Sequence, residues 1–88
     1  GIVYENLGNY PEAIAQYEHS LTITRELGDR AGEAKTLNNI GLVNGLLGNY
    51  PKAIAQYEQS LAITREIGNR ATEALTLNNI GIVYNFLG

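Results

Sequence analysis

Two pairs of adjacent asparagines are the residues of this sequence best suited to contact another molecule. They are Asn38-Asn39 and Asn78-Asn79. Each pair lies inside a segment with the pattern of a helix, where asparagine is a poor helix former. A carboxamide is both donor and acceptor, so it can pair with the backbone of an extended ligand whatever the ligand's side chains are. The same groups could instead hydrogen-bond neighbouring helices to one another, and the sequence leaves both roles open.

Other kinds of site chemistry have few candidates in this chain. There is no cysteine, which excludes disulfides, thiolate metal sites and cysteine nucleophiles. The single histidine, His19, is expected to face solvent. No serine has a histidine and an acid at a spacing that suits a catalytic triad. We therefore expect no enzymatic activity, no cofactor and no metal.

Charge and hydropathy exclude two classes of partner. The net charge is −3, with six Lys and Arg against nine Asp and Glu, whereas a phosphate-binding surface needs a basic stripe. No apolar run approaches the roughly 18 residues of a membrane span. We expect no nucleic-acid partner, no membrane partner and a cytoplasmic, intracellular location. Glutamates on two of the expected helices should form a solvated face with local pairs to Arg25 and Arg65; they are Glu18, Glu26, Glu58 and Glu66.

The elements that position the asparagines come from an internal repeat. Residues 1–40 and 41–80 are identical at 29 of 40 positions, and the last eight residues match the first eight at six. Gly8 can close a helix in the left-handed conformation, and Pro11 suits the first turn of the next helix. Each period therefore contains a helix, a tight turn and a second helix.

Apolar residues recur at steps of three and four, which is the period of one helix face. This pattern predicts helices at 1–8, 10–28, 30–48, 50–68 and 70–87, with no strand. Asp29 is the expected N-cap of the third of these. Such short connections make neighbouring helices antiparallel. The expected core residues are Ala13, Tyr17, Leu21, Leu37, Ile40, Ala53, Tyr57, Leu61, Leu77 and Ile80.

The helix pair resembles the tetratricopeptide repeat. Its pattern W-x2-L-G-x2-Y…A-x3-F is similar to Leu77-x2-Ile80-Gly81-x2-Tyr84 and to Ala53-x3-Tyr57. The resemblance implies an all-α protein, an α-α superhelix. Residues 1–88 then form one solenoid fragment: the end of a first repeat over 1–28, a full repeat over 29–68, and the first helix of a third over 69–88.

Two departures from the common pattern matter. The period is 40 residues rather than 34, and Arg25 and Arg65 stand where a proline is usual, so the second helix of each pair is longer. This longer repeat is similar to the repeats of kinesin light chains, of Leu-Gly-Asn-repeat spindle-orientation adaptors and of bacterial signalling proteins. Asn44 stands where an aromatic is expected, which predicts a less well filled middle repeat and a stabilising effect of Asn44→Tyr.

The resemblance implies protein–protein interaction, with the first helices of each repeat lining a concave groove that holds an extended peptide. The residues expected there are Lys35, Asn38, Asn39, Leu42, Leu46, Leu75, Asn78, Asn79, Ile82, Asn85 and Phe86. Leu42 and Ile82 occupy places where a carboxylate clamp of related domains needs polar groups, so that clamp is absent. Two alternatives stay open: a structural repeat that stacks end to end with other copies, and a regulatory module of an enzyme elsewhere on a longer chain. We also expect the fragment to associate with itself end to end, because the last expected helix carries Ile82, Val83, Phe86 and Leu87 with no following helix to cover them.

Overall fold

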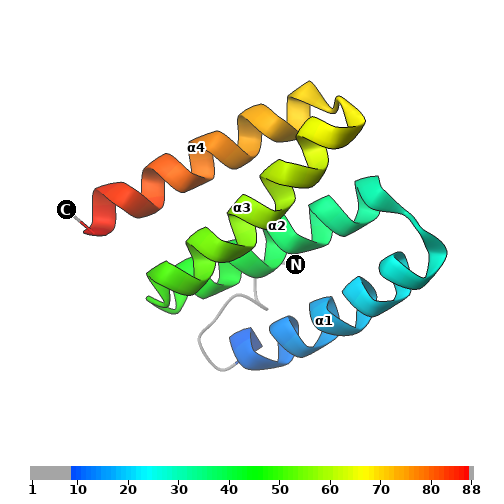
Figure 1. Ribbon diagram of the computed structural model, residues 1–88. Helices are drawn as coiled ribbons and strands as arrows, with labels where there is room; N and C mark the ends of the chain where they lie inside the picture. Colours follow the sequence, from blue (N-terminus) through cyan, green and yellow to red (C-terminus); the bar gives the residue numbers. More distant parts are fainter. Residues whose placement is uncertain (1–8, 88) are drawn as a thin grey trace.

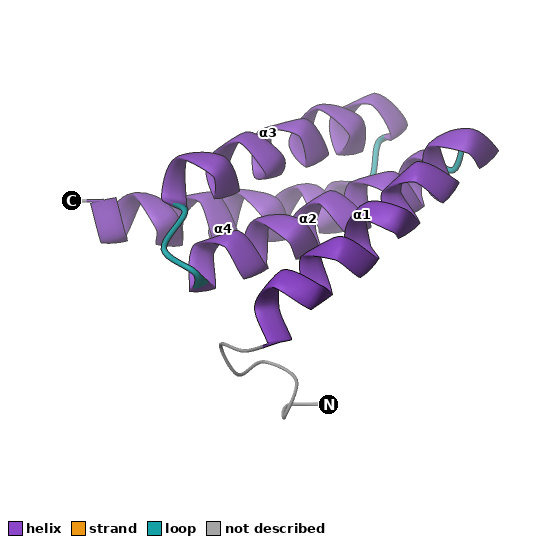
Figure 2. Ribbon diagram, turned by 90° about the horizontal axis from the view of Figure 1, so that it is seen from below, coloured by secondary structure: helices purple, strands orange, loops and turns teal. Residues whose placement is uncertain are grey.

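Residues 9–87, which a computed structural model describes, form four consecutive antiparallel α-helices. The helices are α1 (Tyr10–Leu27), α2 (Arg30–Leu46), α3 (Tyr50–Ile67) and α4 (Arg70–Leu87). Figures 1 and 2 show each helix beside the one before it. The prediction of an all-α chain is confirmed, and these four helices lie within two residues of their predicted ends. The helix expected at 1–8 falls outside the described residues.

The helices end where the repeat places its glycines and caps. Gly28 and Gly68 close α1 and α3 in the left-handed conformation, with φ of 71° and 72°. A side chain at these positions would be strained, so glycine makes the sharp turn possible. The predicted N-cap is confirmed, because Asp29 Oδ1 accepts a hydrogen bond from the backbone nitrogen of Gly32 at 3.0 Å. Asn69 caps α4 in the same way through Thr72, at 3.2 Å.

Helix α2 is the centre of the packing, since it lies against α1 on one side and α3 on the other. The buried cluster it forms with these helices contains Leu21, Ala34, Leu37, Ile40 and Ile63. A second cluster joins α3 to α4 and contains Ala53, Tyr57 and Val83. Tyr57 is only 2% exposed, because its ring packs directly on Gly41 of α2.

Of the ten predicted core residues, five are buried, four are half-buried and one, on α4, is exposed. Leu21, Leu37, Ile40, Ala53 and Tyr57 are buried. The other predicted core residues of α1, α3 and α4 are half-buried; they are Ala13, Tyr17, Leu61 and Ile80. Leu77 is 46% exposed, because among residues 9–87 no helix covers the face of α4 on which it lies.

Asn44 occupies a closed site near the C-terminal end of α2. Its side chain is 1% exposed, and its amide nitrogen has no hydrogen-bond partner among the described residues. The position therefore has no open surface that a larger side chain could fill. A donor buried without a partner costs free energy, so Asn44 weakens the repeat through its polarity.

Candidate functional site

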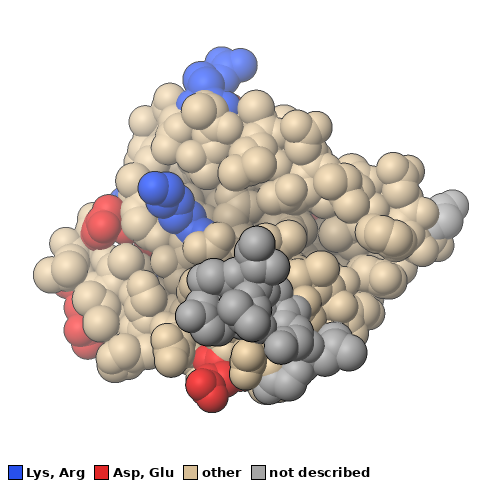
Figure 3. Space-filling view, turned by 180° about the vertical axis from the view of Figure 1, so that it is seen from behind, with Lys and Arg blue, Asp and Glu red and all other residues tan. Residues whose placement is uncertain are grey.

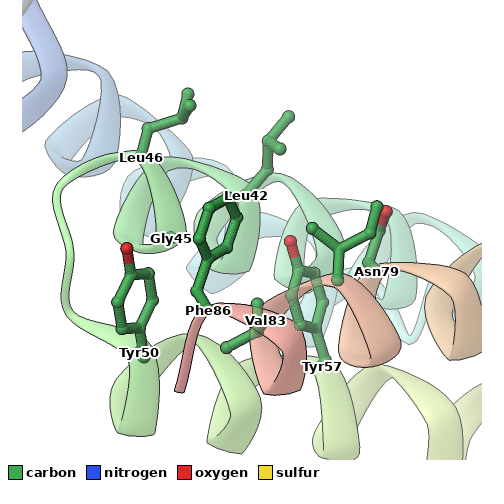
Figure 4. A pocket seen from close by; sticks show the side chains of 9 residues that line it. Leu42, Gly45, Leu46, Tyr50, Tyr57, Asn79, Val83 and Phe86 are labelled. Carbon is green, nitrogen blue, oxygen red and sulfur yellow. The ribbon is translucent and has the colours of Figure 1, made fainter. Parts of the chain in front are cut away.

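A pocket of about 260 Å³ opens between α2 and α4 beside the start of α3. Figure 4 shows its side chains converging from these three helices. The residues that line it are Leu42, Gly45, Leu46, Tyr50, Tyr57, Asn79, Ile82, Val83 and Phe86. Five of them belong to the set expected from the sequence, namely Leu42, Leu46, Asn79, Ile82 and Phe86. We call this hollow the α2–α4 pocket.

The pocket wall is apolar and much of it is accessible to solvent. Leu42 and Leu46 are each 50% exposed on α2, and Ile82 and Phe86 are 53% and 67% exposed on α4. The two residues on each helix share a face because they lie four positions apart, which is about one helical turn. The rings of Tyr50 and Phe86 are stacked, with centroids 5.7 Å apart and planes inclined by 3° (Figure 4). The stack fixes one wall and leaves the Phe86 ring partly open to solvent.

Glycine at position 45 helps to keep the pocket open. A Cβ at Gly45 would lie 4.0 Å from Cγ2 of Val83, which is ordinary van der Waals contact. Alanine would therefore fit at this position, whereas a longer side chain would extend into the space between the two helices. Asn85 stands at the equivalent position of α4.

Asn38 lies beneath the surface rather than on it. Its side chain is buried, its amide nitrogen donates to Oγ1 of Thr76 at 2.8 Å, and its amide oxygen lies 3.5 Å from Nδ2 of Asn79. Thr76 in turn donates to the backbone oxygen of Thr72 at 2.8 Å. Asn38 therefore holds α2 and α4 together, which is the structural role that the sequence left open, and it supports Asn79 at the pocket edge.

The other expected site residues lie on the surface outside the pocket wall. Lys35, Asn39, Leu75, Asn78 and Asn85 are all exposed, and none of them lines the α2–α4 pocket. The set expected from the sequence does not include four of the lining residues, Gly45, Tyr50, Tyr57 and Val83. The turn Gly48-Asn49 was a usable signal for Tyr50, because it returns the chain beside the end of α2.

Charged groups gather at the loops joining α1 to α2 and α3 to α4. Glu33 binds Arg25 at 3.0 Å and Arg30 at 2.8 Å, and Arg30 also binds Glu66 at 2.6 Å. The hydrogen bonds that Arg30 donates to Glu66, with the nearby charges of Glu66 and Glu33, raise the pKa of Arg30 above its usual value. The expected local pairs of Arg25 with glutamates of its own helix are therefore wrong, because the loop brings Glu33 closer.

An arginine–glutamate pair across the loop also occurs in the second repeat. None of these charged residues lines the α2–α4 pocket. Arg65 binds Glu73 of α4 at 3.1 Å, again in place of a glutamate of its own helix. Figure 3 shows one face of the molecule, on which Lys and Arg side chains are few and separated by uncharged surface. In the α2–α4 pocket, burial raises the pKa of Tyr57, so its phenol stays neutral well above pH 7.

Two kinds of feature are absent from residues 9–87. No group of three or more His, Asp or Glu side chains there is placed to hold a metal ion. None of the four helices combines the length and the apolar character that crossing a membrane requires.

The chain belongs to the tetratricopeptide-repeat family, because the model of that repeat matches residues 1–66 and again residues 46–88. Members of this family are in general protein-interaction modules and are typically non-enzymatic scaffolds. The solution NMR structure of a designed protein, DA05, is similar to this chain with a TM-score of 0.86 at 20% identity, over 91% of this chain and 80% of that one. This likeness supports the fold, an α-α superhelix of helical hairpins. No curated protein sequence matches the chain significantly.

Proposed function

We propose that the face formed by α2 and α4 binds an extended peptide and places one large apolar side chain of that peptide in the α2–α4 pocket. The observation that carries the proposal is the convergence of Leu42, Leu46, Ile82 and Phe86, each at least half exposed, on one pocket. Covering this exposed apolar surface with a ligand side chain removes it from water, which favours binding. A pocket of about 260 Å³ suits a single Leu, Phe or Tyr side chain.

Exposed amides next to the pocket supply the polar part of the site. Asn79 lines the pocket and is supported by Asn38, while Asn39 and Asn78, their neighbours in the sequence, are exposed. Their carboxamides pair with the N–H and C=O groups of an extended peptide backbone, so they bind without selecting side chains. Lys35 on the same helix favours a peptide with an acidic residue at that end.

The test is selection of peptides from a random library on the 88-residue chain, followed by measurement of Kd by fluorescence anisotropy. Ile82→Ser and Phe86→Ala should each weaken the selected peptides about tenfold or more, since truncating a buried anchor typically costs over 1 kcal/mol. Ile67→Ser is the matched control, because Ile67 is 40% exposed on α3 and does not line the pocket. Equal Kd values for the pocket variants and the parent chain would refute the proposal.

A further inference from the structure

One face of α4 is open although the equivalent face of α2 is closed. On α2, Ala34 and Leu37 are each 1% exposed. Forty residues later on α4, Ala74 is exposed and Leu77 is 46% exposed. The open face of α4 is made of Ala74, Leu77, Gly81 and Tyr84, which recur at steps of three and four and so lie on one side of the helix. Its apolar character in contact with water favours a partner.

The closed face of α2 shows what kind of partner this surface fits. Helix α3 covers it, and a Cβ at Gly41 would lie 2.7 Å from Cε1 of Tyr57. Ser60 Oγ donates to the backbone oxygen of Ala34 at 2.9 Å. At Gly81 a Cβ would meet no atom within 4 Å. The surface that an aromatic ring covers at Gly41 is therefore uncovered by the described residues at Gly81, and we call it the Gly81 seat.

Helix α1 carries the residues that this seat requires. Tyr17 and Ser20 stand 40 positions before Tyr57 and Ser60, with the same spacing between them. Tyr17 and Ser20 are half-buried, whereas Tyr57 and Ser60 are 2% and 0% exposed. Tyr17 also borders a surface hollow beside α1, so its ring is accessible.

Charge on the two helices is complementary as well. Across the α2–α3 interface, Arg30 binds Glu66 at 2.6 Å. The equivalent arginine on α4 is Arg70, whose side chain is 88% exposed and whose ion pair in residues 9–87 is with Glu73 of the same helix, at 3.3 Å. The equivalent glutamate on α1 is Glu26, which is exposed.

We propose that α1 of a second copy of this chain docks on the open face of α4 and repeats the α2–α3 packing, with Tyr17 over Gly81, Ser20 on Ala74 and Glu26 against Arg70. The segment before α1, GIVYENLG, is a near-copy of GIVYNFLG at the end of α4. The end of α4 in one copy therefore has nearly the same sequence as the segment that precedes α1 in another copy. The contact joins two different surfaces, so a third copy adds in the same way and the chains assemble head to tail.

Sedimentation of the chain at rising concentration tests the docking. The average mass should increase without a plateau at the dimer. Gly81→Ala should weaken association about tenfold or more, because the added methyl group would meet the Tyr17 ring, and such overpacking costs about 1–3 kcal/mol. Gly45→Ala is the matched control and should associate like the parent, since position 45 is a helical glycine outside the open face.

A charge exchange identifies the partner helix. Glu26→Arg and Arg70→Glu should each reduce association, by roughly fivefold if the exposed pair is worth about 1 kcal/mol. In an equimolar mixture, every contact between one variant and the other carries opposite charges again, and association should return towards that of the parent chain. Both substitutions place the charge that suits the helix dipole at their positions.

Four results would overturn the proposal. The first three are a parent chain that stays monomeric at all concentrations, a Gly81→Ala chain that associates like the parent, and a mixture no stronger than either charge variant alone. A mass that stops at the dimer would also overturn it, because that outcome indicates a symmetric contact of α4 with α4.

Discussion

Two glycines at the same position of successive repeats should respond to alanine with opposite signs. Gly41 and Gly81 are 40 residues apart, and each lies in a helix. A Cβ at Gly41 would lie 2.7, 2.9 and 3.1 Å from three atoms of the Tyr57 ring, whereas a Cβ at Gly81 would meet nothing within 4 Å. The two substitutions are chemically identical, so any difference between them reports the tertiary contact alone.

The magnitudes follow from two terms. Alanine replaces glycine within a helix with a gain of about 1 kcal/mol, and this gain applies at both sites. At Gly41 the Tyr57 ring is 2% exposed and has little room to move, so overpacking should cost about 1–3 kcal/mol. Gly81→Ala should therefore raise the free energy of unfolding by up to about 1 kcal/mol, and Gly41→Ala should lower it or leave it unchanged. The difference between the variants should be about 1–3 kcal/mol.

Urea unfolding followed by circular dichroism at 222 nm measures both variants against the parent chain. The protein must be dilute, because self-association would add stability that depends on concentration. A double variant, Gly41→Ala with Tyr57→Leu, checks the cause, since removing the ring should make alanine at 41 favourable. If Gly41→Ala and Gly81→Ala stabilise the chain equally, the close packing of Tyr57 on Gly41 is refuted.

Three further predictions concern the interior. Tyr57→Ala should lower the free energy of unfolding by about 3–5 kcal/mol. Tyr17→Ala should lower it clearly less, because Tyr17 is half-buried. A loss below about 1 kcal/mol for Tyr57→Ala, measured by urea unfolding, would contradict the core assignment. Asn44→Leu should raise the melting temperature because it removes a buried amide whose nitrogen has no described hydrogen-bond partner. Asn44→Tyr should lower the melting temperature because a site that is 1% exposed cannot hold the larger ring. A higher melting temperature for the tyrosine variant would support the sequence-based prediction that Asn44 leaves the middle repeat underfilled. Burial raises the pKa of Tyr57, so this phenol ionises at a lower pH in the unfolded chain, near pH 10, than in the folded one. The free energy of unfolding should therefore fall as pH rises above about 10. Tyr57→Phe should reduce this fall in unfolding curves measured over a pH series, and an unchanged dependence on pH would contradict the prediction.

The sequence by itself determined the elements of this protein. Helix periodicity, the glycine turns and the Asp29 cap act over a few residues, so they can be recognised without knowing the fold, and the structure has them where they were predicted. The repeat and its Ala53-x3-Tyr57 motif likewise identified the packing face of α3. Five of the pocket residues were expected for the same reason, because residues one helical turn apart share a face.

The tertiary structure decided which copy of each repeated residue is buried. Asn38 and Asn78 share the local sequence Thr-Leu-Asn-Asn-Ile-Gly, yet Asn38 is buried against Thr76 and Asn78 is exposed. Leu37 and Leu77 differ in the same way. Tyr50 lines the pocket because the turn after α2 places α3 beside it, and the Phe86 ring stacks on the Tyr50 ring. Burial belongs to a pair of packed elements, so identical residues differ wherever one has a neighbouring helix over it and the other has none among the described residues.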